Sequence, residues 1–305
     1  MKGEERLAAE QVSQLVTEVL SETPLAVTRM TFGHNSVSYE VTLPERALIV
    51  RTNANPKVFS GTAHNLLTLQ KLGLPVSKII ASDLTQTRYP SAYMILEKIP
   101  GRDLRYELST MTPAQKKRLA GQIVSYQRKV ATLPPGGGFG YASIGEVAPC
   151  SSWRELVRSE IRKDLPPNPE PRLAGWRDRV FALTERFVPY LEQVSPTCFL
   201  DDLTIKNVIT QRGELRGLID FDTVCYGDPL WTLGLTAAAI VFDVGPEHLD
   251  YVGELCRAYS LADTERRVVS LYAALFALTF LARGNRVETD RLLGALEGWV
   301  EPLER

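Results

Sequence analysis

The sequence predicts an α+β protein whose strands come first and whose helices follow. Segments of alternating or β-branched composition dominate residues 1–100, whereas stretches with apolar residues at helical spacing dominate residues 101–305. The Pro100-Gly101 pair interrupts the chain where the first pattern gives way to the second. We therefore expect a small β-rich part over residues 1–100 and a larger, mainly helical part over residues 101–305.

The small part is expected to begin with an amphipathic helix. Apolar residues recur at helical spacing from Leu7 to Val19, within residues 5–21. Beyond this helix the patterns predict strands at residues 25–30, 37–43, 47–51 and 78–81, a helix at about residues 60–72, and a strand from Ala92 that runs into the Pro100-Gly101 break.

Helix signals dominate the second part of the chain. Thr112 and Pro113 start a helix that reaches about Leu133, and Ser152 with Glu155 has the spacing of a capping box. A glycine-rich run at residues 134–140 is interpreted as a turn, because it lacks the Lys-Ser or Lys-Thr pair of a phosphate-binding loop. We expect a proline-rich linker at residues 166–171 and further helices at residues 173–194, 230–241, 247–260, 263–283 and 287–303.

Composition and charge are those of an ordinary globular chain, and they disfavour several classes of function. Of the 305 residues, 44% are hydrophobic and 23% are charged, and the formal net charge is −1, so nothing favours a nucleic acid or an anionic membrane as a partner. We find neither a membrane-span pattern nor a signal-peptide pattern, and we expect a cytoplasmic protein that is a monomer or a weak dimer. The 3 histidines and 4 cysteines lack metal-ligand spacing, which disfavours a zinc site.

The most informative stretch is Cys198–Asp228. Two short strands flank a turn at residues 211–214 and predict a hairpin. Asp202 precedes this hairpin, Asn207 stands at its start and Asp220 at its far end. Because a tight hairpin brings its two ends together, we expect these three polar side chains to converge. The two strands are expected at residues 208–210 and 215–219.

Two carboxylates and an amide at one place suit phosphoryl transfer. That reaction needs one carboxylate to orient the attacking hydroxyl and accept its proton, and it needs hard oxygen ligands to hold Mg²⁺ against the phosphates. Asp202 suits the first role, and Asn207 with Asp220 suits the second. The alternative is that Asp202 and Asn207 are turn residues and that Asp220 caps a strand, since Asp and Asn are frequent in turns.

Three separated motifs occur in one order. Asp202 is followed by Asn207, then by the run Ile219-Asp220-Phe221-Asp222, and then by Gly227-Asp228-Pro229. In this order the chain resembles the aminoglycoside phosphotransferase family, small-molecule kinases with a protein-kinase-like fold. That family has His-Gly-Asp-Leu ending in Gly-Asn, then Ile-Asp-Trp/Phe-Glu/Asp, then Gly-Asp-Pro. The resemblance extends over nearly the whole chain, from Gly33 to the C-terminal helices.

The resemblance implies a bilobal protein-kinase-like fold. Residues 1–100 would be the nucleotide-binding N-lobe, ending in a hinge, and residues 101–305 would be the C-lobe with the catalytic loop and the acceptor-binding helices. The implied enzyme transfers the γ-phosphate of ATP, or of GTP, with Mg²⁺, to a hydroxyl of an aminoglycoside-like or other small molecule. On that basis Asp202 is the catalytic residue, while Asn207 and Asp220 hold the metal.

The resemblance also implies which residues contact the nucleotide phosphates. The loop from Gly33 through Asn35 to Ser36 would cover the phosphates with its backbone N–H groups and the Ser36 hydroxyl. Arg51 stands where the fold carries a cation on the third strand, and its planar fork can hold phosphate oxygens at two points. Lys206 would reach the γ-phosphate. A plain hairpin loop and an exposed strand-end cation remain the alternatives for the loop and for Arg51.

The adenine and acceptor contacts are placed by the same resemblance. Backbone groups from Glu97 to Ile99 would meet the edge of the adenine ring, where the last strand of the small part meets the hinge. Helices of the second part would enclose the acceptor, so specificity is expected near residues 150–190 and in the C-terminal helices.

The chain departs from the family pattern in the small part. The fold expects a helix bearing a Glu that pairs with the third-strand cation, but residues 55–82 contain neither Asp nor Glu. Depending on alignment, Thr62, Ala63 or His64 occupies the expected place. Arg51 is therefore expected to lack its usual acidic partner.

Two further departures lie in the second part. Leu200 stands where the family has His, and Thr232 replaces the acid that commonly follows Gly-Asp-Pro. Together with the missing Glu, they leave open an alternative function, a catalytically weak or silent kinase-like protein that binds a nucleotide or a small ligand. An unrelated helical binding protein is disfavoured, because it leaves the spacing of Asp202, Asn207 and Asp220 unexplained.

Overall fold

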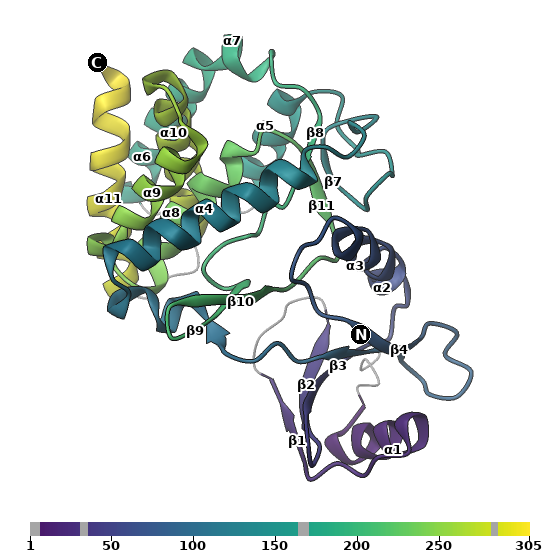
Figure 1. Cartoon of the computed structure of the whole chain (residues 1–305). Helices are drawn as coiled ribbons and strands as arrows, with labels where there is room; N and C mark the ends of the chain where they lie inside the picture. Colours follow the sequence, from purple (N-terminus) through teal and green to yellow (C-terminus); the bar gives the residue numbers. More distant parts are fainter. Residues whose placement is uncertain (1–6, 31–35, 164–170, 282–285) are drawn as a thin grey trace. The chain divides into compact units, whose positions relative to one another are not determined.

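The computed structural model describes residues 7–30, 36–163, 171–281 and 286–305. The chain forms two compact units, both drawn in Figure 1. The first unit comprises residues up to Pro100 together with Gly217–Thr223, and the second comprises Gly101–Arg216 together with Val224–Arg305. A short segment distant in sequence thus completes the first unit.

The first unit is built on an antiparallel sheet with the strand order β1-β2-β3-β5-β4. Helix α1 packs on the sheet, as Figure 1 shows in purple. The elements are α1 (Ala9–Leu20), β1 (Ala26–Arg29), β2 (Val37–Thr42), β3 (Ala47–Asn53), α2 (Lys57–Ser60), α3 (Thr62–Lys71), β4 (Ile79–Asp83) and β5 (Ala92–Glu97).

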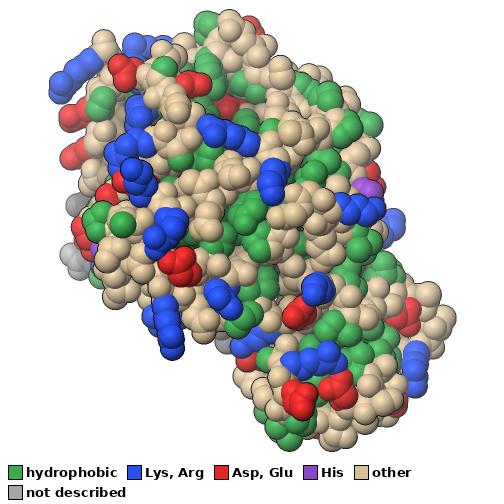
Figure 2. Space-filling model, viewed as in Figure 1, with side chains coloured by type: hydrophobic (Ala, Val, Ile, Leu, Met, Phe, Trp, Pro, Cys, Tyr) green, Lys and Arg blue, Asp and Glu red, His purple; other side chains and the backbone are tan. Residues whose placement is uncertain are grey.

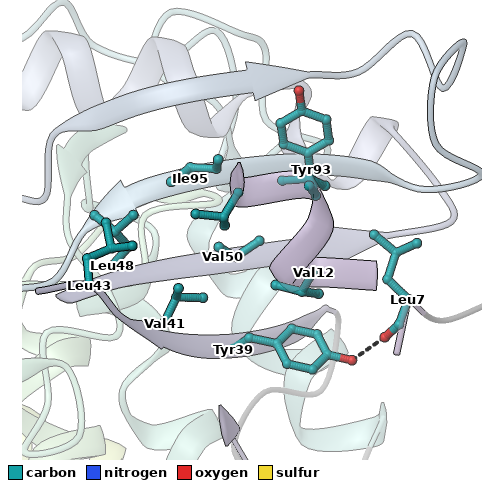
Figure 3. Packing of buried hydrophobic residues seen from close by; sticks show 11 residues of the cluster. Leu7, Val12, Tyr39, Val41, Leu43, Leu48, Val50, Tyr93 and Ile95 are labelled. Carbon is teal, nitrogen blue, oxygen red and sulfur yellow. Dashed lines mark hydrogen bonds between the residues drawn. The ribbon is translucent and has the colours of Figure 1, made fainter. Parts of the chain in front are cut away.

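The core of the first unit lies between α1 and the sheet (Figure 3). Helix α1 contributes Val12 and its helical neighbours, and β3 contributes Leu48 and Val50. Successive side chains of a strand point to opposite faces, so the buried Leu48 and Val50 on one face put Arg51 on the other. The Tyr39 hydroxyl donates a hydrogen bond to the Leu7 carbonyl and satisfies the polar end of a buried ring.

The segment Gly217–Thr223 is attached to the first unit by its backbone. The Leu218 N–H donates to the Pro75 carbonyl at 2.8 Å, next to a parallel bridge between Val76 and Leu218. A Cβ on Gly217 would lie 2.8 Å from the Pro75 oxygen and 2.5 Å from the Ile99 Cδ1. The position therefore requires glycine, because only glycine permits so close a backbone approach.

The second unit is mainly helical, with short strands at its edges. Helix α8 packs against α10 and α11, and α4 packs against α9. Strands are ordered β10-β9-β6 in one small sheet and β7-β11-β8 in another. The elements are β6 (Arg102–Asp103), η1 (Leu104–Tyr106), η2 (Leu108–Thr110), α4 (Pro113–Val130), β7 (Gly140–Ala142), α5 (Trp153–Lys163), α6 (Pro171–Arg186), α7 (Val188–Leu191), β8 (Thr197–Phe199), β9 (Val208–Gln211), β10 (Glu214–Leu218, its last two residues in the first unit), β11 (Val224–Gly227), α8 (Leu230–Asp243), η3 (Pro246–His248), α9 (Asp250–Tyr259), α10 (Asp263–Leu281) and α11 (Arg286–Glu304).

A buried aromatic group and a buried carboxylate connect the helices of the second unit. Trp153 packs edge-on against Trp231 and Tyr272, and its indole N–H donates to the Tyr272 hydroxyl at 2.8 Å. The hydroxyls of Tyr272 and Tyr190 both donate to Asp228 Oδ2, at 2.8 and 2.9 Å. Burial nonetheless raises the pKa of the Asp228 carboxyl above its ordinary value. Asp228 is therefore a structural crosslink in the helical core.

The α+β class predicted from the sequence is confirmed, with strands in the first unit and helices in the second. The hairpin around residues 211–214 forms between β9 and β10, and its turn has positive φ at Arg212 and Gly213. Strands β7, β8 and β11 were not expected, because each is only three or four residues long. The predicted helix over residues 173–194 divides into α6 and α7 before Pro189, where a proline lacks an N–H for helical pairing.

Two local predictions have different outcomes. Half of the expected capping box forms, because the Ser152 hydroxyl accepts from the Glu155 N–H. In the other half the Glu155 carboxylate accepts from the backbone N–H and the hydroxyl of Ser151 instead of from the Ser152 N–H. The predicted linker at residues 166–171 lies almost entirely outside the described residues.

The surface carries charges of both signs. On the face shown in Figure 2, Lys and Arg side chains are interspersed with Asp and Glu, as the net charge of −1 leads one to expect. None of the helices in the described ranges combines the length and the apolar character needed to cross a membrane.

Candidate active site

Arg51 of β3 forms a two-point ion pair with Asp222. The guanidinium Nη1 donates to Asp222 Oδ1 at 2.7 Å, and Nη2 donates to Asp222 Oδ2 at 2.6 Å. The guanidinium carbon also lies 5.3 Å from the centre of the buried Phe59 ring. Burial disfavours the charged guanidinium, but the hydrogen bonds and the charge of Asp222 outweigh it, so the pKa of Arg51 is raised.

Helix α3 holds the same segment through uncharged side chains. The Thr62 hydroxyl donates to Asp222 Oδ1 at 2.8 Å. The Asn65 amide donates to the backbone carbonyls of Phe221 and Asp222, at 3.0 and 3.2 Å. Thr62 and Asn65 are both almost fully buried, so these bonds are shielded from water.

This arrangement corrects the expectation that Arg51 lacks an acidic partner. The acid comes from Asp222, which is distant from α3 in sequence, and Thr62 is the residue of α3 that faces it. Sequence reasoning missed the partner because it looked for an acid only on the helix. The signal that could have found it was an acid two positions after Asp220 in a chain whose residues 55–82 contain none.

Asp220 lies in this segment with an unusual backbone. Its φ is +68°, a left-handed conformation that Asp adopts more readily than most residues. Its Oδ1 is 4.0 Å from Arg51 Nη2, and its side chain is 52% exposed. The carboxylate is thus held close to a buried cation while still able to take a ligand.

Ser36 is the described residue of the predicted phosphate loop, and Gly33 and Asn35 lie outside the described residues. The Ser36 hydroxyl accepts from Arg51 Nη2 at 3.1 Å and from Arg51 Nε at 3.4 Å. Asp222 therefore occupies the Nη1–Nη2 edge of the guanidinium, and Ser36 makes longer contacts along the Nε–Nη2 edge.

Glu97 and Ile99 lie at and just beyond the end of β5. The Glu97 N–H donates to the Lys78 carbonyl at 2.9 Å, and the Lys98 N–H donates to the Ala47 carbonyl at 3.2 Å. In the described part of the chain, none of the backbone hydrogen bonds outside regular helices and strands uses the Ile99 N–H. The strand pairing thus takes up two of the three backbone donors in this stretch.

Asp202 and Asn207 are brought together within the second unit. The Asn207 amide Nδ2 donates to the Asp202 backbone carbonyl at 2.9 Å, and the Thr204 hydroxyl donates to Asp202 Oδ1 at 3.1 Å. Because the Asn207 NH₂ is committed to that carbonyl, the amide oxygen is the atom left to bind a cation. Asp220 belongs to the first unit, and its convergence with these two residues stays a prediction.

The loop that carries Asp202 begins at Leu200, which is the position where the family has His. Gln127 of α4 donates to the Leu200 carbonyl at 2.7 Å and accepts from the Leu200 N–H at 3.0 Å. The Thr232 hydroxyl of α8 donates to the same carbonyl at 2.9 Å. Leu200, Gln127 and Thr232 are all buried. The loop that carries Asp202 is therefore fixed by two side chains that the sequence analysis did not assign to it.

Lys206 lies beside an acid of its own unit. Its Nζ is 3.0 Å from Asp243 Oδ2, and Arg105 Nη1 is 3.8 Å from Asp243 Oδ1. Arg105 also makes two hydrogen bonds to Asp103. Lys206 is thus part of a charged group at the end of α8, with about half of its side chain exposed.

The described residues hold no cluster of three or more His, Cys, Asp or Glu side chains that could bind a metal ion by themselves. A protein site for Mg²⁺ does not need one, because that ion is usually held by one or two side-chain oxygens together with substrate phosphates and water. Asn207 and Asp220 supply hard oxygen atoms of the required kind.

The fold and these residues define a kinase-like phosphotransferase. A model of the phosphotransferase enzyme family matches residues 27–271, and the chain belongs to this family, whose members transfer a phosphoryl group to a hydroxyl. A search of curated protein sequences found no match.

Solved structures with the same fold are aminoglycoside phosphotransferases. The apo form of a thermostable mutant of APH(4)-Ia is 15% identical, with a TM-score of 0.70, covering 95% of this chain and 98% of that chain. A ternary complex of a further mutant of that enzyme with AMP-PNP and hygromycin B is 16% identical, with a TM-score of 0.67 and coverage of 96% and 98%. The GDP complex of aminoglycoside 2'-phosphotransferase-IIIa is 14% identical, with a TM-score of 0.70 and coverage of 97% and 99%. At these identities the likeness establishes the protein-kinase-like fold.

Proposed function

We propose that this protein is a kinase that transfers the γ-phosphate of ATP or GTP to a hydroxyl group of a small molecule. The observation that carries the proposal is the Asp202 loop, where the Asn207 amide donates to the Asp202 carbonyl at 2.9 Å and Gln127 holds the loop start. Such pre-organisation is what phosphoryl transfer requires, because its catalysis is mainly positioning and charge stabilisation.

The proposed chemical roles follow from the donor set of each residue. Asp202 orients the acceptor hydroxyl and takes up its proton. The Asn207 amide oxygen and the Asp220 carboxylate hold Mg²⁺, which when bound supplies positive charge against the phosphates. Arg51 holds phosphate oxygens, and like any arginine it is charged at every physiological pH. Each role is assigned to a side chain whose oxygen or nitrogen atoms are of the kind that the role requires.

The nucleotide contacts are proposed for residues 1–100 of the first unit, which would form the N-lobe. Ser36, with Gly33 and Asn35, would cover the phosphates, and the Glu97 carbonyl with the Ile99 N–H would pair with the base. The strand pairing of the Glu97 and Lys98 N–H groups supports this choice, because it leaves the Ile99 donor for a ligand. Among the solved structures with this fold, one contains AMP-PNP and another contains GDP, so both ATP and GTP are candidates.

The acceptor is proposed to be a small hydroxylated molecule bound by helices of residues 101–305. The aminoglycosides hygromycin B and kanamycin occupy structures with this fold, which supports the class of acceptor and leaves its identity to be measured. Lys206 is a weaker candidate for the γ-phosphate than the sequence analysis suggests, because its ammonium is paired with Asp243 at 3.0 Å.

The alternative of a silent kinase-like protein has less support than it has from the sequence. It depended on a third-strand cation without a partner and on an altered catalytic loop. Arg51 has its acid in Asp222, and the Leu200 backbone is held by Gln127 and Thr232. Neither departure therefore argues against turnover.

The test is thermal unfolding of the purified protein with ATP or GTP, with and without Mg²⁺. At a nucleotide concentration of 100 times Kd, binding should stabilise the folded state by about 2.7 kcal/mol, and the shift should require both metal and nucleotide. Asp220→Asn should abolish the metal-dependent shift. Asp178→Asn, on a side chain that is 72% exposed on α6, is the matched control and should retain it. Absence of any shift with either nucleotide would refute the proposal.

If the shift is present, transfer is measured with a panel of acceptors and labelled nucleotide. Phosphorylation of a hydroxylated acceptor by the wild-type protein, lost in Asp202→Ala, is the expected result. Nucleotide hydrolysis that no acceptor accelerates would count against a small-molecule kinase.

A further inference from the structure

The ion pair between Arg51 and Asp222 has a consequence for how the nucleotide site is assembled. In the protein-kinase-like fold a helix glutamate restrains the third-strand cation, and here residues 55–82 contain no acid. Both carboxylate oxygens of Asp222 accept hydrogen bonds from Arg51, at 2.7 and 2.6 Å. Two parallel charge-assisted hydrogen bonds fix the plane of the guanidinium as well as its position.

We propose that Asp222, Thr62 and Asn65 are positioning residues that together replace the missing helix glutamate. This inference rests on the proposed function, because the group they position is the cation proposed to hold phosphates. Asp222 supplies the charge, and helix α3 supplies the hydrogen bonds that hold Asp222 in place. We call these three side chains with Arg51 the α3 clamp.

The α3 clamp differs from a helix glutamate in what it connects. A glutamate on the helix would tie the helix to Arg51 alone. Here Asn65 binds the carbonyls of Phe221 and Asp222, and Asp222 binds Arg51, so the segment that carries Asp220 is tied to both α3 and β3. The proposed metal ligand and the proposed phosphate ligand are therefore held by one hydrogen-bonded group.

The geometry of the guanidinium leaves one edge for a phosphate. Asp222 takes the Nη1–Nη2 edge with short bonds, while the Nε–Nη2 edge meets Ser36 Oγ at 3.4 and 3.1 Å. A phosphate oxygen is a stronger acceptor than a hydroxyl, so it would take the second edge without breaking the ion pair. Arg51 can thus stay paired with Asp222 and bind a phosphate at the same time.

The position of Thr62 allows a rescue experiment. Its hydroxyl is separated from the Arg51 guanidinium only by the Asp222 oxygen that both of them bind. A glutamate at position 62 would therefore bring a carboxylate to Arg51 when the Asp222 side chain is shortened. Thr62→Gln is the control of equal size without charge.

Mg-nucleotide affinity is measured by thermal shift for Asp222→Ala, Asp222→Ala/Thr62→Glu and Asp222→Ala/Thr62→Gln. We expect at least a tenfold loss of affinity in the first variant, recovery to within about threefold of wild type in the second, and no recovery in the third. If Asp222 had only a structural role, Thr62→Gln would restore the nucleotide affinity of Asp222→Ala as well as Thr62→Glu does. Wild-type affinity in Asp222→Ala would overturn the proposal.

A second measurement keeps the inference testable if the wild-type protein binds no nucleotide, which would refute the proposed function. Melting temperatures of the unliganded protein are then compared for Arg51→Met, Asp222→Asn and the double variant. We expect the double variant to lose clearly less than the summed losses of the single variants, because the removed groups interact. Additive losses would show that the pair does not restrain Arg51, and would overturn the inference by itself.

Discussion

Arg51 and Asp222 are 171 positions apart in the chain, yet the two side chains are joined through both guanidinium Nη atoms and both carboxylate oxygens. The pair lies against Phe59 and receives the Thr62 hydroxyl. An ion pair so largely removed from water stabilises its unit only while both partners are present, since a single partner left behind is an uncompensated charge.

Arg51→Lys tests the two-point geometry. Lysine keeps the charge but offers a compact ammonium in place of a planar fork, so one of the two bonds to Asp222 is lost. We expect a stability loss of about 1–3 kcal/mol, since hydrogen bonds to charged groups contribute on that order. Chemical denaturation measures it, with Lys98→Arg as a control on a partly exposed cation of the same unit. Unchanged stability would mean that charge alone suffices.

Asp202→Ala tests the catalytic role. Removing a positioned proton acceptor should lower kcat by about 10²- to 10⁴-fold. Nucleotide affinity should change little, because Asp202 is not proposed to bind the nucleotide. Steady-state kinetics with the best acceptor, together with thermal shifts, separate the two effects. Comparable turnover in the variant would remove Asp202 from the catalytic role.

Asp220→Asn tests the metal-binding role without disturbing the backbone. Asn tolerates the left-handed conformation at φ +68° at least as well as Asp does, so stability without ligand should be within about 0.5 kcal/mol of wild type. Mg²⁺-dependent nucleotide affinity should fall at least tenfold, as measured by titration at several Mg²⁺ concentrations. An unchanged affinity would assign the metal to other ligands.

Gln127→Leu tests the anchor of the catalytic loop. The substitution leaves the buried N–H of Leu200 without its partner and removes one of two donors to the Leu200 carbonyl, so we expect a loss of about 2–3 kcal/mol. Activity should fall even at low temperature, where the variant stays folded, because the loop that carries Asp202 is no longer fixed. Thr232→Val should cost about 1 kcal/mol, and Thr232→Ser, which keeps the hydroxyl, should cost less than Thr232→Val. Equal costs for the two Thr232 variants would show that the hydroxyl does not hold Leu200.

Glu107 predicts a pH dependence of stability. Burial tends to raise the pKa of its carboxyl, but hydrogen bonds from the N–H groups of Gly213 and Arg212, at 2.8 and 3.1 Å, outweigh burial and lower it below the ordinary 4.5. A lowered folded-state pKa contributes stability that is fully present above pH 4.5 and is lost as pH falls through the folded-state value.

Glu107→Gln removes this contribution. The difference in unfolding free energy between wild type and Glu107→Gln should therefore be constant above about pH 5.5 and shrink below pH 4.5. Urea unfolding across a pH series measures the difference. A difference that stays the same down to about pH 3 would contradict the assigned pKa.

Much of the architecture followed from local pattern. The pattern at residues 47–51 predicted the strand β3, and in the structure Arg51 lies on the face opposite Leu48 and Val50 because the side-chain period of a strand is two. Thr112 and Pro113 predicted the start of α4, where the Thr112 hydroxyl accepts the Gln115 N–H as an N-cap. Patterns of this kind depend on neighbours within a few residues, so the sequence carries them in full.

By itself the sequence determined the fold class, the family, and the residue types available for phosphoryl transfer. Only the tertiary structure decided which acid pairs with Arg51 and which side chains hold Leu200. Neither could be inferred from local pattern, because Asp222 meets Arg51 and Gln127 meets Leu200 across 171 and 73 positions of the chain. Distances in space between such residues depend on the packing of whole elements, and any nearby acid or amide of the right reach can satisfy a buried cation or backbone group.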